Sequence, residues 1–268
     1  MIEHLRPGAT ADGARVVLFD FDGTISLVRS GWVDVMVPMM VEFLAETNSG
    51  ESKAELEAIV LEFVGRLTGR QTIYQMIELC DNITRRGGTP KEPVVYKKIY
   101  LDRLMDKIKT RIEDLEAGRV SPEQWLVPGS RALLEGLKER GLTMYLASGT
   151  DDAYVKHEAR ILQVDHYFTG IYGALDDYKS FSKAILIKQI IDRAENKGEE
   201  FLGFGDGYVE IENVKNVGGV AVGIASDEPE CQKVDLWKRE RLVNVGADWI
   251  VPNFEQTEEL FAALFPGK

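Results

Sequence analysis

The sequence predicts an α/β fold in which a parallel sheet is interrupted by an inserted helical domain. Short apolar runs alternate with helical patterns in the second half of the chain, which is typical of a parallel sheet with helices on both faces. Between the first apolar run and this alternating part, residues 25–126 carry almost only the apolar spacing of amphipathic helices. The first strand, before the insert, is expected to belong to the same sheet.

The first predicted strand is the apolar run Val-Val-Leu-Phe at residues 16–19, which a turn-forming sequence follows directly. A run this short, bounded by a turn signal, predicts a strand buried on both faces. The later strands are predicted at 143–147, 171–174, 201–204, 220–224 and 248–251, and the helices between and after them at 132–140, 151–163, 182–195 and 255–264.

The insert is predicted to be a helical bundle with its own small core. Apolar residues recur at the i, i+3, i+4, i+7 spacing of helices in four stretches of it. Connections rich in Gly, Thr and Pro separate some of these stretches. We therefore expect one domain from residues 1–24 and 127–268 and a second from residues 25–126. The four helical stretches are 33–44, 56–67, 73–80 and 101–115.

The overall composition excludes several classes of function. The formal net charge of the 268 residues is -12, so the surface repels nucleic acid and no nucleic-acid partner is expected. No apolar run approaches the roughly 18 residues of a membrane span, and the first residues lack the apolar stretch of a secretory signal. We expect a cytoplasmic protein with no membrane partner.

The cysteines and histidines give no support to a zinc or Ser-His-Asp hydrolase. The two cysteines, Cys80 and Cys231, are far apart in the sequence, and the three histidines are scattered without a metal-binding spacing.

Polar residues directly follow three of the predicted strands. Asp20 and Asp22 follow the first, Ser148 follows the second, and Asp206 follows the strand at 201–204, with Glu210 one helical turn later. Ligands of open parallel sheets bind beyond the carboxyl ends of the strands. Two ionised carboxylates this close repel each other, and magnesium, which prefers oxygen ligands, relieves the repulsion. The alternative is that Asp20 and Asp22 only cap a turn.

An acidic protein that handles phosphate also needs local positive charge and hydrogen-bond donors. Ser148-Gly149-Thr150 offers a hydroxyl and backbone N–H groups to an anion, although the same residues could simply begin a helix. Lys183, at a predicted helix start, could neutralise a phosphoryl group. Lys179 is a rival in the same segment.

These motifs together resemble the haloacid dehalogenase superfamily of phosphatases and phosphotransferases. The four motifs of that superfamily stand here in its order as Asp20-Phe21-Asp22-Gly23-Thr24, Tyr145-Leu146-Ala147-Ser148, Lys183, and Gly205-Asp206-Gly207-Tyr208-Val209-Glu210. The spacing from Lys183 to Asp206 is similar to that of the family, which favours Lys183 over Lys179. The resemblance implies a Rossmann-like parallel sheet core with an inserted α-helical cap domain. Glu210 departs from the pattern, which usually has Asp there.

The resemblance also implies the chemical roles of the site residues. Asp20 is the nucleophile and forms an aspartyl-phosphate, and Asp22 is the general acid and base. Ser148 and Lys183 complete the catalytic set. The cofactor is Mg2+, with Asp20, Asp22, Asp206 and Glu210 as the metal residues, Asp22 through its backbone carbonyl and Glu210 either directly or through a water.

Substrate contacts are expected from the turn, from the second motif and from the cap. By resemblance, amides near Gly23, Thr24 and Gly149 hold phosphoryl oxygens. Arg29, Arg66 and Arg70 lie at predicted ends of cap helices, and Arg suits hydroxylated or anionic substrates. The alternative for each arginine is an ordinary surface residue.

The resulting hypothesis is a magnesium-dependent phosphatase that acts on a small phosphorylated metabolite such as a sugar phosphate. A phosphotransferase or sugar phosphomutase would use the same residues, with a second hydroxyl in place of water. A hypothesis from another functional class is a non-catalytic domain that binds a phosphometabolite or a partner protein. The presence of Asp20, Asp22, Lys183 and Asp206 argues against it.

Overall fold

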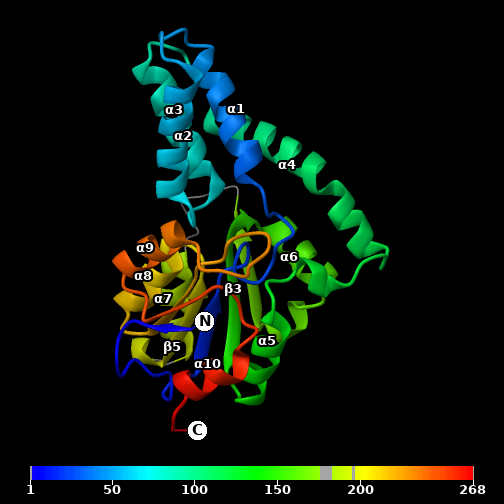
Figure 1. Ribbon diagram of the computed structural model, residues 1–268, viewed down its shortest axis with the longest axis vertical. Coiled ribbons are helices and arrows are strands. Elements are labelled where there is room, and N and C mark those ends of the chain that lie inside the picture. Colours follow the sequence, from blue (N-terminus) through cyan, green and yellow to red (C-terminus); the bar gives the residue numbers. More distant parts are fainter. Residues whose placement is uncertain (1, 176–182, 195–196, 268) are drawn as a thin grey trace. The chain divides into compact units, whose positions relative to one another are not determined.

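The computed structural model describes residues 2–175, 183–194 and 197–267. The chain divides into two compact units, each described here by itself. The core unit consists of Met1–Ser30 and Ile112–Lys268, and the helical unit consists of Gly31–Arg111 (Figure 1). Residues 25–30 and 112–126 of the predicted insert therefore belong to the core unit.

The strands in the described part of the core unit form one seven-stranded sheet, in the order β1-β7-β6-β5-β2-β3-β4. All neighbouring strands pair in parallel except β1, which is antiparallel to β7 at the edge. The predicted parallel α/β architecture is confirmed. The strands are β1 Glu3–His4, β2 Val16–Phe19, β3 Thr143–Asp151, β4 Gly170–Ala174, β5 Phe201–Gly205, β6 Val220–Ile224 and β7 Trp249–Val251.

Helices lie on both sides of this sheet. Figure 1 shows α5 and α6 on one side and α7, α8 and α9 on the other. The helices of the core unit are α5 Ser130–Glu139, α6 Asp152–Ile161, α7 Lys183–Ala194, α8 Tyr208–Asn216, α9 Leu236–Asn244 and α10 Thr257–Leu264. Single turns of 3-10 helix span Pro122–Trp125, Asp165–Tyr167 and Gly198–Glu200.

Strand β2 contributes to the core on both faces of the sheet, as its short apolar run predicts. Val16 and Leu18 belong to one buried cluster together with side chains of α7, α8 and α9. The alternate residue Phe19 stacks on Phe204 of β5 with ring centroids 4.8 Å apart, because successive side chains of a strand point to opposite faces. All four residues of β2 are at most 3% exposed, so the residues that follow β2 start from a fixed position.

The helical unit contains α1 to α4. The four predicted helices are confirmed, with ends that differ from the prediction by up to eight residues, the largest difference being at the start of α4. Helix α2 begins with a capping box, because the Ser52 hydroxyl accepts from the Glu55 N–H and the Glu55 carboxylate accepts from the Ser52 N–H. Helix α4 continues past Arg111 into the core unit. The bounds are α1 Val33–Ala45, α2 Lys53–Leu67, α3 Thr72–Arg85 and α4 Pro93–Glu116.

Two differences from the sequence prediction concern the region of the site. Strand β3 extends to Asp151, four residues beyond the predicted end at Ala147, with a register shift between these two residues. Helix α9 has no counterpart among the predicted helices, because its residues are mostly polar and only Leu242 is buried. Residue 182, the predicted start of the third core helix, lies outside the described residues.

A separate observation concerns membranes. None of the helices in the described ranges is long and apolar enough to span a bilayer.

Candidate active site

The strand register brings the predicted site residues to one edge of the sheet. Phe19, the last residue of β2, lies opposite Leu146 of β3 and Phe204 of β5. The Asp20 N–H donates to the Phe204 carbonyl at 2.9 Å. Asp20, Ala147 and Gly205, the residues that come next, therefore lie at the same level, toward the carboxyl ends of these parallel strands.

The turn after β2 is tight and needs glycine at its centre. The Gly23 N–H donates to the Ser26 carbonyl and the Ile25 N–H donates to the Phe21 carbonyl, both at 2.9 Å. Gly23 has a φ of +74°, in the left-handed region that favours glycine. A Cβ at this position would lie 2.4 Å from Asp206 Oδ2. The Asp206 carboxylate is thus packed directly against the backbone of the turn.

Thr24 links this turn to the end of β5. It is fully buried, and its hydroxyl accepts from the Asp206 N–H at 2.9 Å. The Thr24 hydroxyl therefore helps to position Asp206, and the predicted contact of Thr24 with substrate stays a prediction. Gly23 also helps to position Asp206, because its lack of a side chain makes room for the Asp206 carboxylate.

Asp22 is held by two hydroxyl groups from the end of β3. Its Oδ2 accepts from Ser148 Oγ at 3.2 Å and from Thr150 Oγ1 at 2.8 Å. The Ser148 hydroxyl in turn accepts from the Thr150 N–H at 2.9 Å. Thr150 is a site residue that the prediction missed, although it stands in the same Ser-Gly-Thr triplet. Two hydroxyl donors on one oxygen fix the orientation of the Asp22 carboxylate.

Arg29 lies beside Asp22 and is engaged by a buried carboxylate. The Arg29 guanidinium donates to both carboxylate oxygens of Glu158 in α6, at 2.6–3.1 Å, and Arg29 Nε is 3.9 Å from Asp22 Oδ1. Both members of the pair are buried, Glu158 completely. The predicted location of Arg29 at the end of a cap helix is corrected, because Arg29 belongs to the core unit and lies beside Asp22. Its predicted contact with substrate stays a prediction.

Burial and Arg29 act on Glu158 in opposite directions. Burial, the larger influence, raises the pKa of Glu158, while the Arg29 guanidinium beside it lowers that pKa in part. Glu158 was not predicted from the sequence, since a single Glu in an amphipathic helical pattern gives no signal of burial.

The oxygen donors at this edge fit a magnesium ion. Asp22 Oδ1 is a buried oxygen that accepts no hydrogen bond, and Gly23 leaves a cradle into which the Asp206 carboxylate fits. Within the described residues, no three Asp, Glu, His or Cys side chains form a group that could hold a metal ion by themselves. Magnesium typically uses one or two protein carboxylates and completes its shell with waters and substrate phosphate. The predicted set of four metal residues stays a prediction.

The remaining predicted residues of the core unit are Glu210, Lys183 and Gly149. Glu210 lies in α8 and is fully buried, with its carboxylate against the backbone of Gly205. Helix α7 begins at Lys183, whose side chain lies outside the described part, as does the whole of Lys179. Gly149 lies between the two hydroxyl residues of β3.

Arg66 and Arg70 belong to the helical unit. Arg66 is exposed and pairs with Glu62 at 3.1 Å and with Glu78 at 3.4 Å. Arg70 lies over the ring of Tyr74, 5.8 Å from its centroid. Their predicted contact with substrate stays a prediction.

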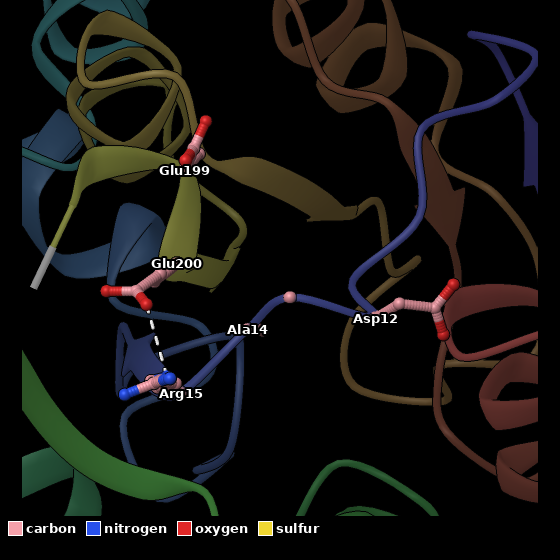
Figure 2. Close-up of a pocket in the computed structure, with 6 residues that line it drawn as sticks. Asp12, Ala14, Arg15, Glu199 and Glu200 are labelled. Atoms are coloured by element: carbon pink, nitrogen blue, oxygen red, sulfur yellow. Dashed lines mark ion pairs between the residues drawn. The ribbon is translucent and has the colours of Figure 1, made fainter. Parts of the chain in front are cut away.

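A surface hollow of about 530 Å³ lies at the opposite edge of the sheet. Figure 2 shows its charged residues, of which Arg15 and Glu200 form an ion pair of 3.1 Å. Arg15 and Glu200 directly precede β2 and β5, so this hollow is at the amino ends of the strands. The residues that line it are Asp12, Gly13, Ala14, Arg15, Glu199 and Glu200.

The parallel sheet and the acidic turn after β2 are features of a class of enzymes that comparison with protein-family models identifies. Residues 14–218 match the haloacid dehalogenase-like hydrolases. The chain belongs to this family, and the predicted enzyme class, a hydrolase of this superfamily, is confirmed. Enzymes of this family that are phosphatases generally use Mg2+.

A relative and several solved structures are similar to the chain. A 5'-nucleotidase from Pseudomonas aeruginosa is 28% identical over 102 residues, which are 38% of this chain and 46% of that protein. The chain thus aligns with less than half of the length of this relative.

The similar solved structures share the fold. A β-phosphoglucomutase from Clostridium difficile has a TM-score of 0.62 at 12% identity, covering 94% of this chain and 97% of that one. A protein described as a predicted phosphatase from Clostridium acetobutylicum has a TM-score of 0.59 at 16% identity, covering 94% and 99%. A protein described as a predicted phosphoglycolate phosphatase from Haemophilus somnus has a TM-score of 0.57 at 16% identity, covering 92% and 98%.

Proposed function

We propose that the protein hydrolyses a small phosphomonoester in two steps through an aspartyl-phosphate on Asp20. The observation that carries this proposal is the meeting of three acidic positions at one edge of the sheet. Asp20 and Asp22 flank the turn after β2, and Asp206 from β5 is packed against the same turn. The family assignment to hydrolases supports it.

In the first step, a carboxylate oxygen of Asp20 attacks phosphorus while the bond from phosphorus to the ester oxygen breaks. Asp22, in its protonated form, gives its proton to the leaving oxygen. The products of this step are the free alcohol, the aspartyl-phosphate and an ionised Asp22. The hydroxyls of Ser148 and Thr150 stabilise the resulting charge on Asp22 by donating to its Oδ2.

In the second step, a water molecule attacks phosphorus and gives one proton to Asp22. The bond between phosphorus and the Asp20 oxygen breaks, which regenerates the carboxylate and releases inorganic phosphate. Arg29, held by Glu158, lies 3.9 Å from Asp22 and helps to keep the Asp22 carboxylate in place for this step.

When bound, magnesium would neutralise negative charge on the phosphoryl group. The Asp20 carboxylate, the Asp22 backbone carbonyl and the Asp206 carboxylate would hold it, with Glu210 in support. Lys183, which the family pattern places at the start of α7, would add a second positive charge. The helical unit would serve as the cap that selects the substrate, with Arg66 and Arg70 as contacts.

The proposed substrate is a small metabolite such as a sugar phosphate. The structures described as phosphatases and as a β-phosphoglucomutase support this class, and the 5'-nucleotidase relative adds nucleoside monophosphates to the compounds worth testing. A phosphomutase would use the same residues, and faster consumption of the phosphoester when sugar acceptors are added would favour it.

The first prediction tests the nucleophile. Purified protein with Mg2+ is expected to release inorganic phosphate from at least one member of a panel of sugar phosphates, phosphoglycolate and nucleoside 5'-monophosphates. Asp20→Asn should abolish this release, because an amide cannot form the aspartyl-phosphate, while circular dichroism and the melting temperature stay close to wild type. Asp12→Asn, at the opposite edge of the sheet, is the matched control and should keep full activity. Full activity in Asp20→Asn contradicts the proposal.

A further inference from the structure

A partly buried group of three charged side chains lies against the turn after β2, and two of its members have no role in the proposed reaction. Lys238 Nζ donates to Asp206 Oδ2 at 3.2 Å and also to Glu228 Oε1. The side chains of all three residues are between 11% and 18% exposed. Glu228 comes from the segment after β6, and Lys238 from the first turn of α9.

Both carboxylates of this group touch the same point of the turn. A Cβ on Gly23 would lie 2.4 Å from Asp206 Oδ2 and 2.9 Å from Glu228 Oε1. Two carboxylates this close repel each other, and burial makes the repulsion stronger. Burial and the neighbouring carboxylates of Asp206 and Asp22 raise the pKa of Glu228, while Lys238 lowers it in part. The ammonium that bridges the two carboxylates is therefore what allows Asp206 to stay in its place.

Lys238 itself is held in a fixed position. The Asp235 side chain caps α9 and accepts from the Lys238 N–H at 2.8 Å. Burial disfavours the ammonium, but the Asp206 and Glu228 carboxylates outweigh this effect and raise the pKa of Lys238. Lys238 thus remains charged at neutral pH. Its backbone is fixed by the cap and its ammonium by two carboxylates.

Asp206 is consequently fixed from two sides. Thr24 accepts from its backbone N–H, and Lys238 donates to its carboxylate. We propose that Lys238, anchored by Glu228, is a positioning residue that fixes the Asp206 carboxylate against the Gly23 turn. This inference rests on the proposed function, in which Asp206 holds the divalent cation. Lys238 contacts neither the nucleophile nor the general acid in any hydrogen bond described above, so it acts through Asp206.

The neighbouring Arg239 offers a matched control on the same helix. Arg239 NH2 pairs with Glu3 of β1 at 2.7 Å, so it also ties α9 to the rest of the core unit. It makes no ion pair with Asp206 among the described contacts. A purely structural role for the charges of α9 would give Lys238 and Arg239 variants the same behaviour.

The second prediction is therefore a change in cation binding. The dissociation constant of Mg2+ is measured by calorimetry in the wild-type protein without phosphoester, as the parent, and in Lys238→Gln. Lys238→Gln should weaken Mg2+ binding by about 10- to 100-fold, the usual effect of removing a residue that orients a metal ligand. Lys238→Arg should recover part of the affinity, Glu228→Gln should lose less than Lys238→Gln, and Arg239→Gln should bind as the parent.

Lys238→Gln should lower kcat by a similar factor while the KM for the phosphoester changes little, because the proposed reaction gives Lys238 no contact with substrate. Mg2+ binding in Lys238→Gln that is unchanged, or tighter than in the parent, overturns the inference. If Lys238→Gln fails to fold, as judged by circular dichroism, the Lys238→Arg and Glu228→Gln results decide in the same way.

The failures of the two proposals are distinguishable. Wild-type protein that binds Mg2+ but releases no phosphate contradicts the proposed function, and the calorimetric series still decides the role of Lys238. Wild-type protein that releases phosphate while Lys238→Gln binds Mg2+ normally overturns only the inference. Absence of Mg2+ binding in the parent overturns the inference together with the metal requirement.

Discussion

Both edges of the sheet carry several carboxylates, but the surroundings of these carboxylates differ between the two edges. At the carboxyl edge, Asp20 is 5% exposed and Glu158 is fully buried. At the amino edge, Glu199 is exposed and the Arg15 side chain that pairs with Glu200 is 73% exposed (Figure 2). Acidic composition alone therefore does not distinguish the two places.

The difference lies in what each carboxylate contacts. Removing a carboxylate from water is costly unless cations or hydrogen-bond donors replace the water. At the carboxyl edge two hydroxyls hold Asp22, Arg29 holds Glu158 and Lys238 holds Asp206. At the amino edge Glu199 is exposed, and the Arg15 partner of Glu200 is 73% exposed. The partners at the carboxyl edge are themselves mostly shielded from water, so they fix the orientation of the charges there more firmly, which is what catalysis by carboxylates needs.

The largest effect on stability is expected from breaking the Arg29–Glu158 pair. Arg29→Met should lower the free energy of unfolding by about 3–5 kcal/mol, because it leaves a buried carboxylate without its partner. Urea denaturation near neutral pH measures this. The double variant Arg29→Met/Glu158→Gln removes the unpaired charge and should be more stable than Arg29→Met. Equal stability of the single and double variants would show that the two side chains are not coupled.

The same variant should also change the dependence of stability on pH. Without Arg29, only burial acts strongly on Glu158, and burial raises its pKa above the ordinary value of 4.5. A carboxyl group with a raised pKa in the folded state makes stability fall as the pH rises through that pKa. The loss of stability in Arg29→Met should therefore be smallest in acid, near the ordinary value, and should grow toward neutral pH. A loss that is constant over this range contradicts the assignment.

These partners also show how much of the site the sequence could predict. Asp20, Asp22 and Asp206 follow a strand and Ser148 lies near the end of one, so the period of the apolar pattern and the topology rule for parallel sheets suffice to bring them to one edge. Arg29, Glu158, Glu228 and Lys238 follow no such rule. They are charged residues that a sequence pattern assigns to the surface. Only the three-dimensional contacts reveal that Arg29 and Glu158 form a buried pair and that Glu228 and Lys238 form a partly buried one.

The fold shows the same limit. The core strands and the four helices of the insert have strong apolar periodicity, and the sequence predicts them. Strand β1 has two residues, and α9 buries mainly Leu242, so neither has a periodic pattern to recognise. The extension of β3 past Ala147 depends on a register shift against β4, which is set by pairing between distant residues and not by local sequence.

A smaller effect is expected at Thr24. Thr24→Val keeps the shape of the side chain but removes the acceptor of the Asp206 N–H, which costs about 1–3 kcal/mol when a buried donor is left without a partner. It should also lower kcat, because Asp206 loses one of its two attachments. Thr257→Val is the control, since its buried hydroxyl donates to the Phe254 carbonyl far along the chain from the site. An equal fall of kcat in both variants would attribute the effect to stability alone.

The smallest effect is expected at the amino edge, where the contrast between the two edges can be tested most directly. Glu200→Gln removes a charge from an ion pair whose Arg15 side chain is largely in water, and such pairs contribute about 0–1 kcal/mol. The free energy of unfolding should change within this range, and the change should shrink in about 1 M salt, where exposed charges are screened. Phosphate release should keep the wild-type kcat. A fall in kcat comparable to that of the Lys238 variant would mean that the two edges are not functionally different. The burial of charged side chains would then not distinguish the catalytic edge from an ordinary acidic surface.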